Sequence, residues 1–206
     1  MKFKTISWPN NQPETTEIIA LRMAHAGILA AVADFDEAAS AISQNRKYSP
    51  VEKSVEIDDA KQTAHVELDR ITREDLRHLA EDFKRERAET KRHAVPSESA
   101  ERRYREIRAV LRDLPVTKRK AALDEALTMR DLLLIEAIQG GSPLLCGMTG
   151  PEYAAFVERT REALYGEFLR TLDQCEEILT QLQEQLTQAK KYIDSYEIEG
   201  EYASAV

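Results

Sequence analysis

The chain has 206 residues, of which 32% are charged and 6% are aromatic, and its formal net charge is −8. Two cysteines, Cys146 and Cys175, are too few for a disulfide framework, so the simpler expectation is a reducing compartment and a cytoplasmic protein. The amino terminus lacks an apolar run of signal-peptide length, and nowhere are eighteen consecutive residues apolar, so neither export nor a membrane-spanning segment is expected.

Glycine and proline, seven of each, are concentrated in a few narrow zones, which is typical of long helices joined by few turns. We therefore expect an all-α fold, an elongated up-and-down antiparallel four-helix bundle with coiled-coil character, its third rod broken at Pro115. An extended arm over 1–12, a bundle domain over 13–196 and an acidic tail over 197–206 complete this interpretation. The alternative topology is two helical hairpins that splay and pair with another copy of the chain.

The first two helices are predicted from capping signals. Asn11 followed by Glu14 predicts the first start, and this helix runs to about Arg46. The sequence SPVE from Ser49 is a capping box with proline at the first helical position, and the second helix runs to about His93. The residues expected to face inward are Ile18, Leu21, His25, Ile28, Val32, Phe35, Ala39 and Ile42 in the first helix and Val55, Ala64, Leu68, Ile71, Leu79 and Phe83 in the second.

Proline and serine then delimit a third and a fourth helix. Ser97 is positioned to cap a helix over 98–113, and Pro115 ends it. The fourth helix is expected over 117–138, where its last residues are apolar on nearly all faces. Gly140 is expected to end this helix as a left-handed cap.

The last helix carries the clearest periodic signal in the sequence. Its seam positions, spaced alternately three and four residues apart, are all apolar, which predicts a wide helix-packing face. The two seam sets are Tyr165, Leu172, Leu179, Leu186 and Ile193, and Phe168, Cys175, Leu182, Ala189 and Tyr196.

The segment IQGGSPLLCGMTGP, residues 138–151, resembles a glycine-rich catalytic loop only in composition. It lacks the lysine and hydroxyl that a phosphate-binding loop needs after its last glycine, and no histidine is near Cys146 in sequence to activate the thiol. TGPE, from Thr149 to Glu152, is instead a capping box. Two interpretations remain for its apolar residues, a cap on the open end of the core or an exposed contact for a partner, and the residues concerned are Leu144, Leu145, Cys146 and Met148, together with Trp8 of the arm.

Charge is segregated along the chain. Residues 84–120 contain thirteen Lys and Arg against six Asp and Glu, whereas the remainder to the end contains six against sixteen. Three cations fall in the first turn of the fourth helix, where the helix dipole disfavours them. The candidate anion-binding or partner-binding residues are Arg102, Arg103, Arg105, Arg108, Lys118, Arg119 and Lys120. They form a solvated or internally paired face, bind an acidic protein or the chain's own tail, or bind nucleic acid.

The histidines give little support for a metal site. His65 with Asp69, and His78 with its neighbouring aspartates, have the spacing of surface ion pairs, and no Glu-x-x-His motif occurs in the sequence. His25 differs because it occupies a seam position among apolar residues. It is either a hydrogen-bonded core histidine or a residue that fixes register and responds to pH.

These patterns lead to an expectation about function. The sequence predicts a non-enzymatic helical scaffold or adaptor without a cofactor, which contacts other proteins, self-associates and does not bind membranes. The alternative is a nucleic-acid-associated regulator that binds through residues 84–120, although nucleic acid is the weaker of the two partner predictions. A remote alternative is an enzyme that uses Cys146.

Overall fold

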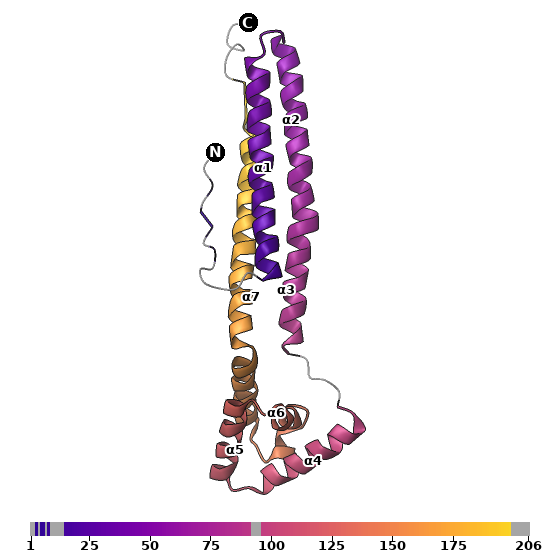
Figure 1. Cartoon of the computed structure of the whole chain (residues 1–206), viewed down its shortest axis with the longest axis vertical. Coiled ribbons are helices and arrows are strands. Elements are labelled where there is room, and N and C mark those ends of the chain that lie inside the picture. The colour runs from indigo at the N-terminus through magenta and orange to yellow at the C-terminus, as the bar shows by residue number, and fades with distance from the viewer. Residues whose placement is uncertain (1–2, 4, 7, 9–14, 92–95, 199–206) are drawn as a thin grey trace. The chain divides into compact units, whose positions relative to one another are not determined.

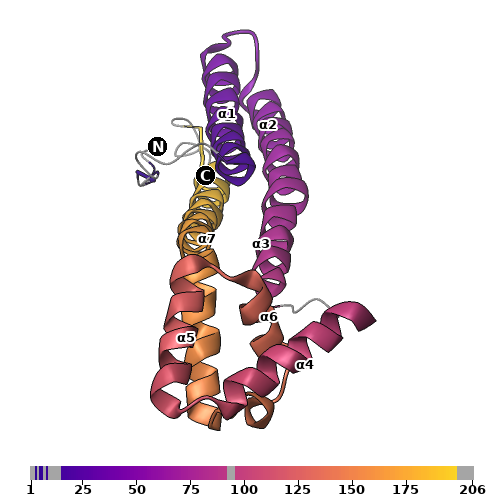
Figure 2. The same ribbon diagram turned by 60° about the horizontal axis from the view of Figure 1, so that its bottom comes forward.

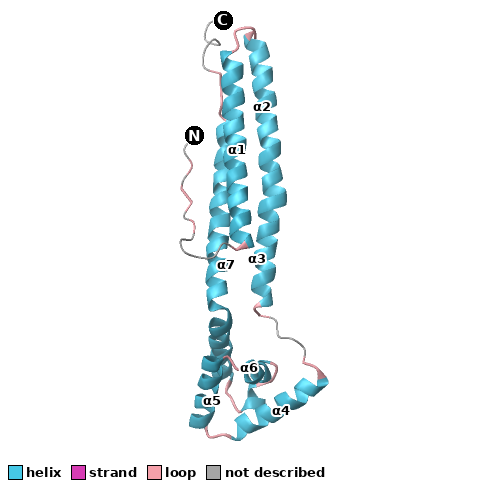
Figure 3. Ribbon diagram, in the orientation of Figure 1, coloured by secondary structure: helices cyan, strands magenta, loops and turns pink. Residues whose placement is uncertain are grey.

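The computed structural model describes residues 3, 5, 6, 8, 15–91 and 96–198, and these residues include helices but no strand, which confirms the all-α prediction (Figure 3). Figure 1 labels the α-helices, which are joined by one π-helical and one 3-10 segment. In chain order the elements are α1 (Thr16–Gln44), α2 (Pro50–Arg70), η1 (Ile71–Leu76), α3 (Arg77–Glu89), α4 (Glu98–Asp113), α5 (Val116–Met129), α6 (Leu132–Gln139), η2 (Pro143–Cys146) and α7 (Gly150–Asp194).

Three helix starts, those of α2, α4 and α7, follow the predicted capping chemistry. At α2 the Ser49 side chain accepts from the backbone N–H of Glu52, and the Glu52 carboxylate accepts from the backbone N–H of Ser49. Ser97 caps α4, and Thr149 forms the predicted box at the start of α7. The start of α1 differs, because Thr15 is its N-cap. The predicted cap from Asn11 to Glu14 lies outside the described residues.

Two predictions about the fourth helix are wrong. Arg130 adopts a left-handed conformation (φ 52°) and ends α5, while Asp131 caps the separate helix α6 by accepting from the backbone N–H of Leu134. Gly140 does end α6, but with φ −77° it is not a left-handed cap. The left-handed glycine is Gly147, with φ 67°, at the end of η2. The apolar spacing over 117–138 predicted one continuous helix. The Asp131 side chain caps a second helix within this range and so divides it.

The chain divides into two compact units, which are called unit 1 (residues 1–84 and 172–206) and unit 2 (residues 85–171). The expected bundle domain over 13–196 is thus divided. The four-helix arrangement and the coiled coil are not confirmed, because α4, α5 and α6 belong to unit 2 and have a core of their own. Unit 1 is built from α1, the continuous α2–η1–α3 helix and the second half of α7.

The core of unit 1 lies among these three helical segments, which run side by side in Figures 1 and 2. The predicted seam of the last helix is buried from Leu172 to Ile193, whereas Tyr165 and Phe168 are 40% and 44% exposed. Val55, predicted to face inward, is also exposed, and Ile57 is buried in its place. The fully buried side chains of this core include Leu21, Ile28, Leu68, Ile71, Ile178 and Leu182.

Polar contacts fix the register of α7 against its neighbours in unit 1. The Tyr192 hydroxyl donates to Asp36 of α1 over 2.8 Å. Lys190 forms an ion pair with Asp69 of α2 at 2.5 Å. His65 pairs with Asp194 of α7 at 2.8 Å, rather than with the Asp69 expected from helical spacing. Each bond joins segments that are far apart in sequence.

The described residues of the arm pack on the helices of unit 1. Ile6 is buried, and Phe3 and Trp8 pack on the core. α1 is also long and apolar enough to cross a membrane by length and composition, with a mean hydropathy of 1.6 over its best window. The buried residues of α1 belong to the core of unit 1. Packing therefore explains the apolar character of that side of the helix.

Replacing Leu182 with alanine should destabilise the protein by about 2–5 kcal/mol, because its fully buried side chain would leave a cavity between the helices. Leu144→Ala is the matched control, since Leu144 is 80% exposed, and it should change stability by less than about 0.5 kcal/mol. Urea unfolding followed by circular dichroism measures both. Equal losses for the two variants would contradict the position of the core.

Candidate functional site

The glycine-rich segment 138–151 is divided between the core of unit 2 and the surface. Cys146 and Met148 are buried beside Phe156, whereas Leu144 and Leu145 are 80% and 47% exposed. Both interpretations of this apolar set therefore have a physical counterpart. Two of its residues fill the core, and the other two are open to solvent on the short helix η2.

Cys146 lacks the environment of a nucleophile. Burial raises the pKa of its thiol, and this effect exceeds the opposing influence of Arg108 and Arg119. A reactive cysteine needs the reverse, an accessible thiolate with a depressed pKa. The geometry therefore fits a small apolar core residue.

Arg108, one of the candidate anion-binding or partner-binding residues, is buried and internally paired inside unit 2. One guanidinium nitrogen donates to the carbonyl of Ala137 at 2.9 Å, and another bonds Glu101 at 2.5 Å. A Cβ added at Gly141 would lie 2.6 Å from the Cδ atom of Arg108. Position 141 is therefore occupied by glycine because a larger side chain there would collide with Arg108.

Arg119 uses all of its guanidinium nitrogens in the same way. Nε donates to the carbonyl of Leu111 at 2.9 Å, Nη2 donates to that of Leu114 at 3.0 Å, and Nη1 donates to that of Gly147. Carbonyls at a helix end have no partner within the helix, so a cation there is stabilising. The unfavourable position of Arg119 in the first turn of α5 is offset because it caps the end of α4.

The remaining basic candidates lie on the surface of unit 2. Arg102 pairs with Glu98 at 2.7 Å, and Arg105 pairs with Glu101 at 3.2 Å. Burial raises the pKa of the Glu101 carboxyl, but hydrogen bonds from Arg105 and Arg108 outweigh it and hold that pKa below its usual value. The exposed basic candidates outside these pairs are Arg103, Lys118 and Lys120.

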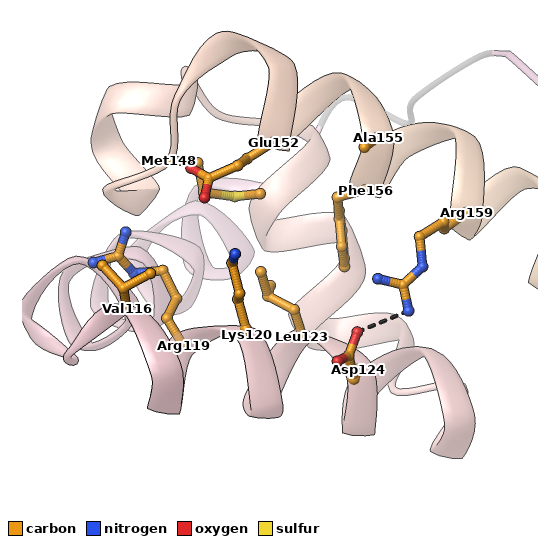
Figure 4. A pocket seen from close by; sticks show the side chains of 10 residues that line it. All are labelled: Val116, Arg119, Lys120, Leu123, Asp124, Met148, Glu152, Ala155, Phe156 and Arg159. Carbon is orange, nitrogen blue, oxygen red and sulfur yellow. Dashed lines mark ion pairs between the residues drawn. The ribbon is translucent and has the colours of Figure 1, made fainter.

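A groove of about 270 Å³ lies between α5 and the start of α7 (Figure 4). Leu123, Met148 and Phe156 supply apolar surface to it. Arg159 and Asp124 form a 2.7 Å ion pair at one end, drawn as a dashed line in Figure 4. The other residues that line it are Val116, Arg119, Lys120, Glu152 and Ala155. The groove can accept an apolar side chain beneath a charged rim.

A larger cavity of about 490 Å³ is lined by residues of α4, α6 and α7 and by Thr90, Lys91 and Pro96, and no sequence pattern predicted it. Tyr104 donates a hydrogen bond to Glu136 across it, and this bond, with burial and the carboxylate charge, raises the pKa of Tyr104. Among the residues that line this cavity, the hydroxyl of Thr160 and Nε of Arg161 are buried without a hydrogen-bond partner. We refer to this site as the Arg161 cavity.

His25 is half-buried in unit 1, so it is not a fully buried core residue. Its ring centroid lies 5.8 Å from that of Trp8, whose face also carries the guanidinium of Arg22 at 5.4 Å. Burial lowers the pKa of His25. Trp8, a candidate partner contact, therefore packs against His25 and Arg22 of α1 in the same chain.

Across the described part of the chain, no group of three or more His, Cys, Asp and Glu side chains could hold a metal ion. Comparison of the chain with models of protein families, with curated proteins and with solved structures gave no match.

Gly147→Ala should destabilise the protein by at least about 1–2 kcal/mol, because an alanine at φ 67° is strained and its Cβ would lie 2.9 Å from Nη1 of Arg119. Gly150→Ala is the control, since nothing lies within 4 Å of the added methyl group, and it should be neutral within about 0.5 kcal/mol. Thermal unfolding of the two variants tests this, and similar midpoints would refute the proposed role of Gly147.

Arg119→Met should cost at least about 2 kcal/mol, because three hydrogen bonds from one guanidinium group to backbone carbonyls are lost at once. Lys120→Met removes the same charge from the next, exposed position and should cost less than about 0.5 kcal/mol. The free energy of unfolding in urea separates the two roles. If both variants were equally stable, Arg119 would be an ordinary surface cation.

Proposed function

We propose that the protein is a non-enzymatic helical scaffold that acts through protein–protein contacts and associates with a second copy of itself through α1. The observation that carries this proposal is an apolar stripe on α1 that remains exposed within unit 1. Ile19 is 44% exposed and Met23 is 70% exposed. The stripe continues along the helix through Ala26, Ala30 and Ala33, which are also exposed.

These five residues share one side of the helix because they are spaced alternately four and three residues apart. The opposite side of α1 is already buried in the core of unit 1. α1 is therefore apolar on two sides, although the described residues of unit 1 cover only one of them. A helix that is apolar around most of its circumference needs neighbours on most of its circumference.

A second copy of α1 is the occupant that fits the stripe best. In an antiparallel pair related by a two-fold axis between residues 26 and 30, Ala26 faces Ala30 of the second copy, and Met23 faces its Ala33. Large side chains then oppose small ones, which permits close packing of the two helices. In the same register Ile19 faces the acidic Glu37 of the second copy, so the apolar contact ends at this pair. Four-helix and coiled-coil character would then arise between copies rather than within one chain.

Most of the seven basic candidates are already in ion pairs or internal hydrogen bonds, which weakens the nucleic-acid alternative. Of the seven basic candidates, Arg108 and Arg119 bond groups within unit 2, and Arg102 and Arg105 are in ion pairs with glutamates of α4. A nucleic-acid interface would depend on Arg103 and the lysines of α5. Binding to DNA or RNA that weakens steeply with salt would support this second function.

Met23→Glu should shift the protein from dimer to monomer, because a carboxylate on the stripe would be desolvated in the contact. Multi-angle light scattering over a concentration series measures the change, and the dissociation constant should rise at least about tenfold. Val66→Glu is the matched control, since Val66 is 60% exposed on α2, and it should leave the dimer intact.

A wild-type protein that is monomeric at every concentration would overturn the self-association proposal, and so would equal weakening by the two glutamate variants. Co-sedimentation of the wild type with phosphatidylcholine vesicles, lost in Met23→Glu, would reassign the stripe to lipid.

A further inference from the structure

We infer that the Arg161 cavity of unit 2 binds a small organic anion, a carboxylate or a phosphate monoester with an apolar body, through Arg161 and Thr160. The inference is independent of the proposed scaffold function, which rests on unit 1. The cavity volume of about 490 Å³ lies in the range of small-molecule sites. All of its lining residues belong to unit 2.

The first observation is the Thr160 hydroxyl. Thr160 is only 1% exposed, and its oxygen has no hydrogen-bond partner. Other threonines of the same helix, Thr171, Thr180 and Thr187, each donate to the backbone carbonyl four residues earlier. Thr160 does not make that local bond. A buried hydroxyl without a partner costs about 1–3 kcal/mol, so a ligand atom that bonds it recovers that free energy.

The second observation is Arg161, the next residue along α7. Its Nε is buried and has no acceptor, although the residue lines the same cavity. Arginine carries five donors and no acceptor, so an acceptor is what the site lacks. Elsewhere in unit 2, Arg108 and Arg119 show how buried guanidinium groups are satisfied, with carbonyls and a carboxylate. Arg161 is the exception among these three.

The carboxylates that line the cavity do not supply that acceptor. Glu136 accepts the hydrogen bond of Tyr104, and Glu158 is exposed to solvent. Within the described residues, neither forms an ion pair with Arg161, whose Nε has no hydrogen-bond partner. An incoming carboxylate or phosphate matches the planar donor fork of arginine and can also accept from Thr160. Lys91 lines the same cavity and adds a second cation.

The other lining residues favour a ligand with an apolar portion. The apolar residues that line the cavity are Leu132, Ile135, Val157 and Leu164. An anion without an apolar portion would leave this surface wet, whereas a short alkyl chain gains about 0.8 kcal/mol for each methylene that it buries. The cavity therefore favours an alkyl carboxylate or alkyl phosphate over inorganic phosphate.

Isothermal titration calorimetry of the full chain tests the inference with octanoate, octyl phosphate, inorganic phosphate and octylammonium as probes. The octyl anions should bind, inorganic phosphate should bind more weakly, and octylammonium should not bind. The relative affinity of octanoate and octyl phosphate distinguishes the two kinds of head group.

Arg161→Gln should weaken binding of the octyl anions at least about tenfold, because a charge-assisted hydrogen bond is lost. Thr160→Val, which is nearly the same size, should weaken it several-fold and serves as a second variant if the first folds poorly. Arg159→Gln removes the same charge two residues away, where it pairs with Asp124 in the other groove, and should leave affinity unchanged. Absence of binding by both octyl anions, equal binding of octylammonium, or equal affinity of wild type and both cavity variants would overturn the inference.

Discussion

The apolar seam of α7 fills the space beside α1 and α2, and unit 1 depends on its burial. Each buried leucine of the seam is worth about 1.5–3 kcal/mol relative to an exposed one. Two antiparallel helices without this third segment would leave the core face of α1 in water. The same helix supplies Phe156 to the core of unit 2, so α7 contributes buried residues to both units.

Unit 2 is stabilised in a different way, by arginines that act as internal crosslinks. Its helices are short, and their ends leave carbonyl groups that need donors. Arg119 satisfies carbonyls at the ends of α4 and η2, and Arg108 joins α4 to α6. Gly141 and Gly147 are required where these side chains pass close to the backbone. The glycines and the basic residues, which looked like two separate features of the sequence, form one structural device.

Against this background of satisfied groups, two places stand out because their chemistry is incomplete. The stripe of α1 offers apolar surface that unit 1 does not cover, which favours a second helix. The Arg161 cavity offers buried donors that the described residues do not satisfy, which favours an anion. The first demands a partner with shape and apolar area, whereas the second demands a charge. For this reason they are assigned to different kinds of ligand.

Local chemistry determined what the sequence predicted correctly. The caps at Ser49, Ser97 and Thr149 depend on residues three positions apart, and the α7 seam depends on a repeat within one helix. The caps and the seam can both be recognised in the sequence without knowledge of the fold. The left-handed Arg130 was missed because the apolar residues on either side of it gave no sign of a break. Val55 and Ile57 could not be told apart by spacing, since which side of α2 meets α1 is fixed by the neighbouring helix.

The sequence by itself determined that the chain is helical, where most helices begin and which side of α7 is buried. Only the tertiary structure decided that the chain divides into two units, that Arg108 and Arg119 point inward, and that Thr160 and Arg161 line a cavity. Arg119 bonds a carbonyl 28 residues away, and Arg108 bonds one 29 residues away. Hydrogen bonds and burial of this kind depend on which segments meet in space, and a one-dimensional pattern of charge and polarity does not contain that information.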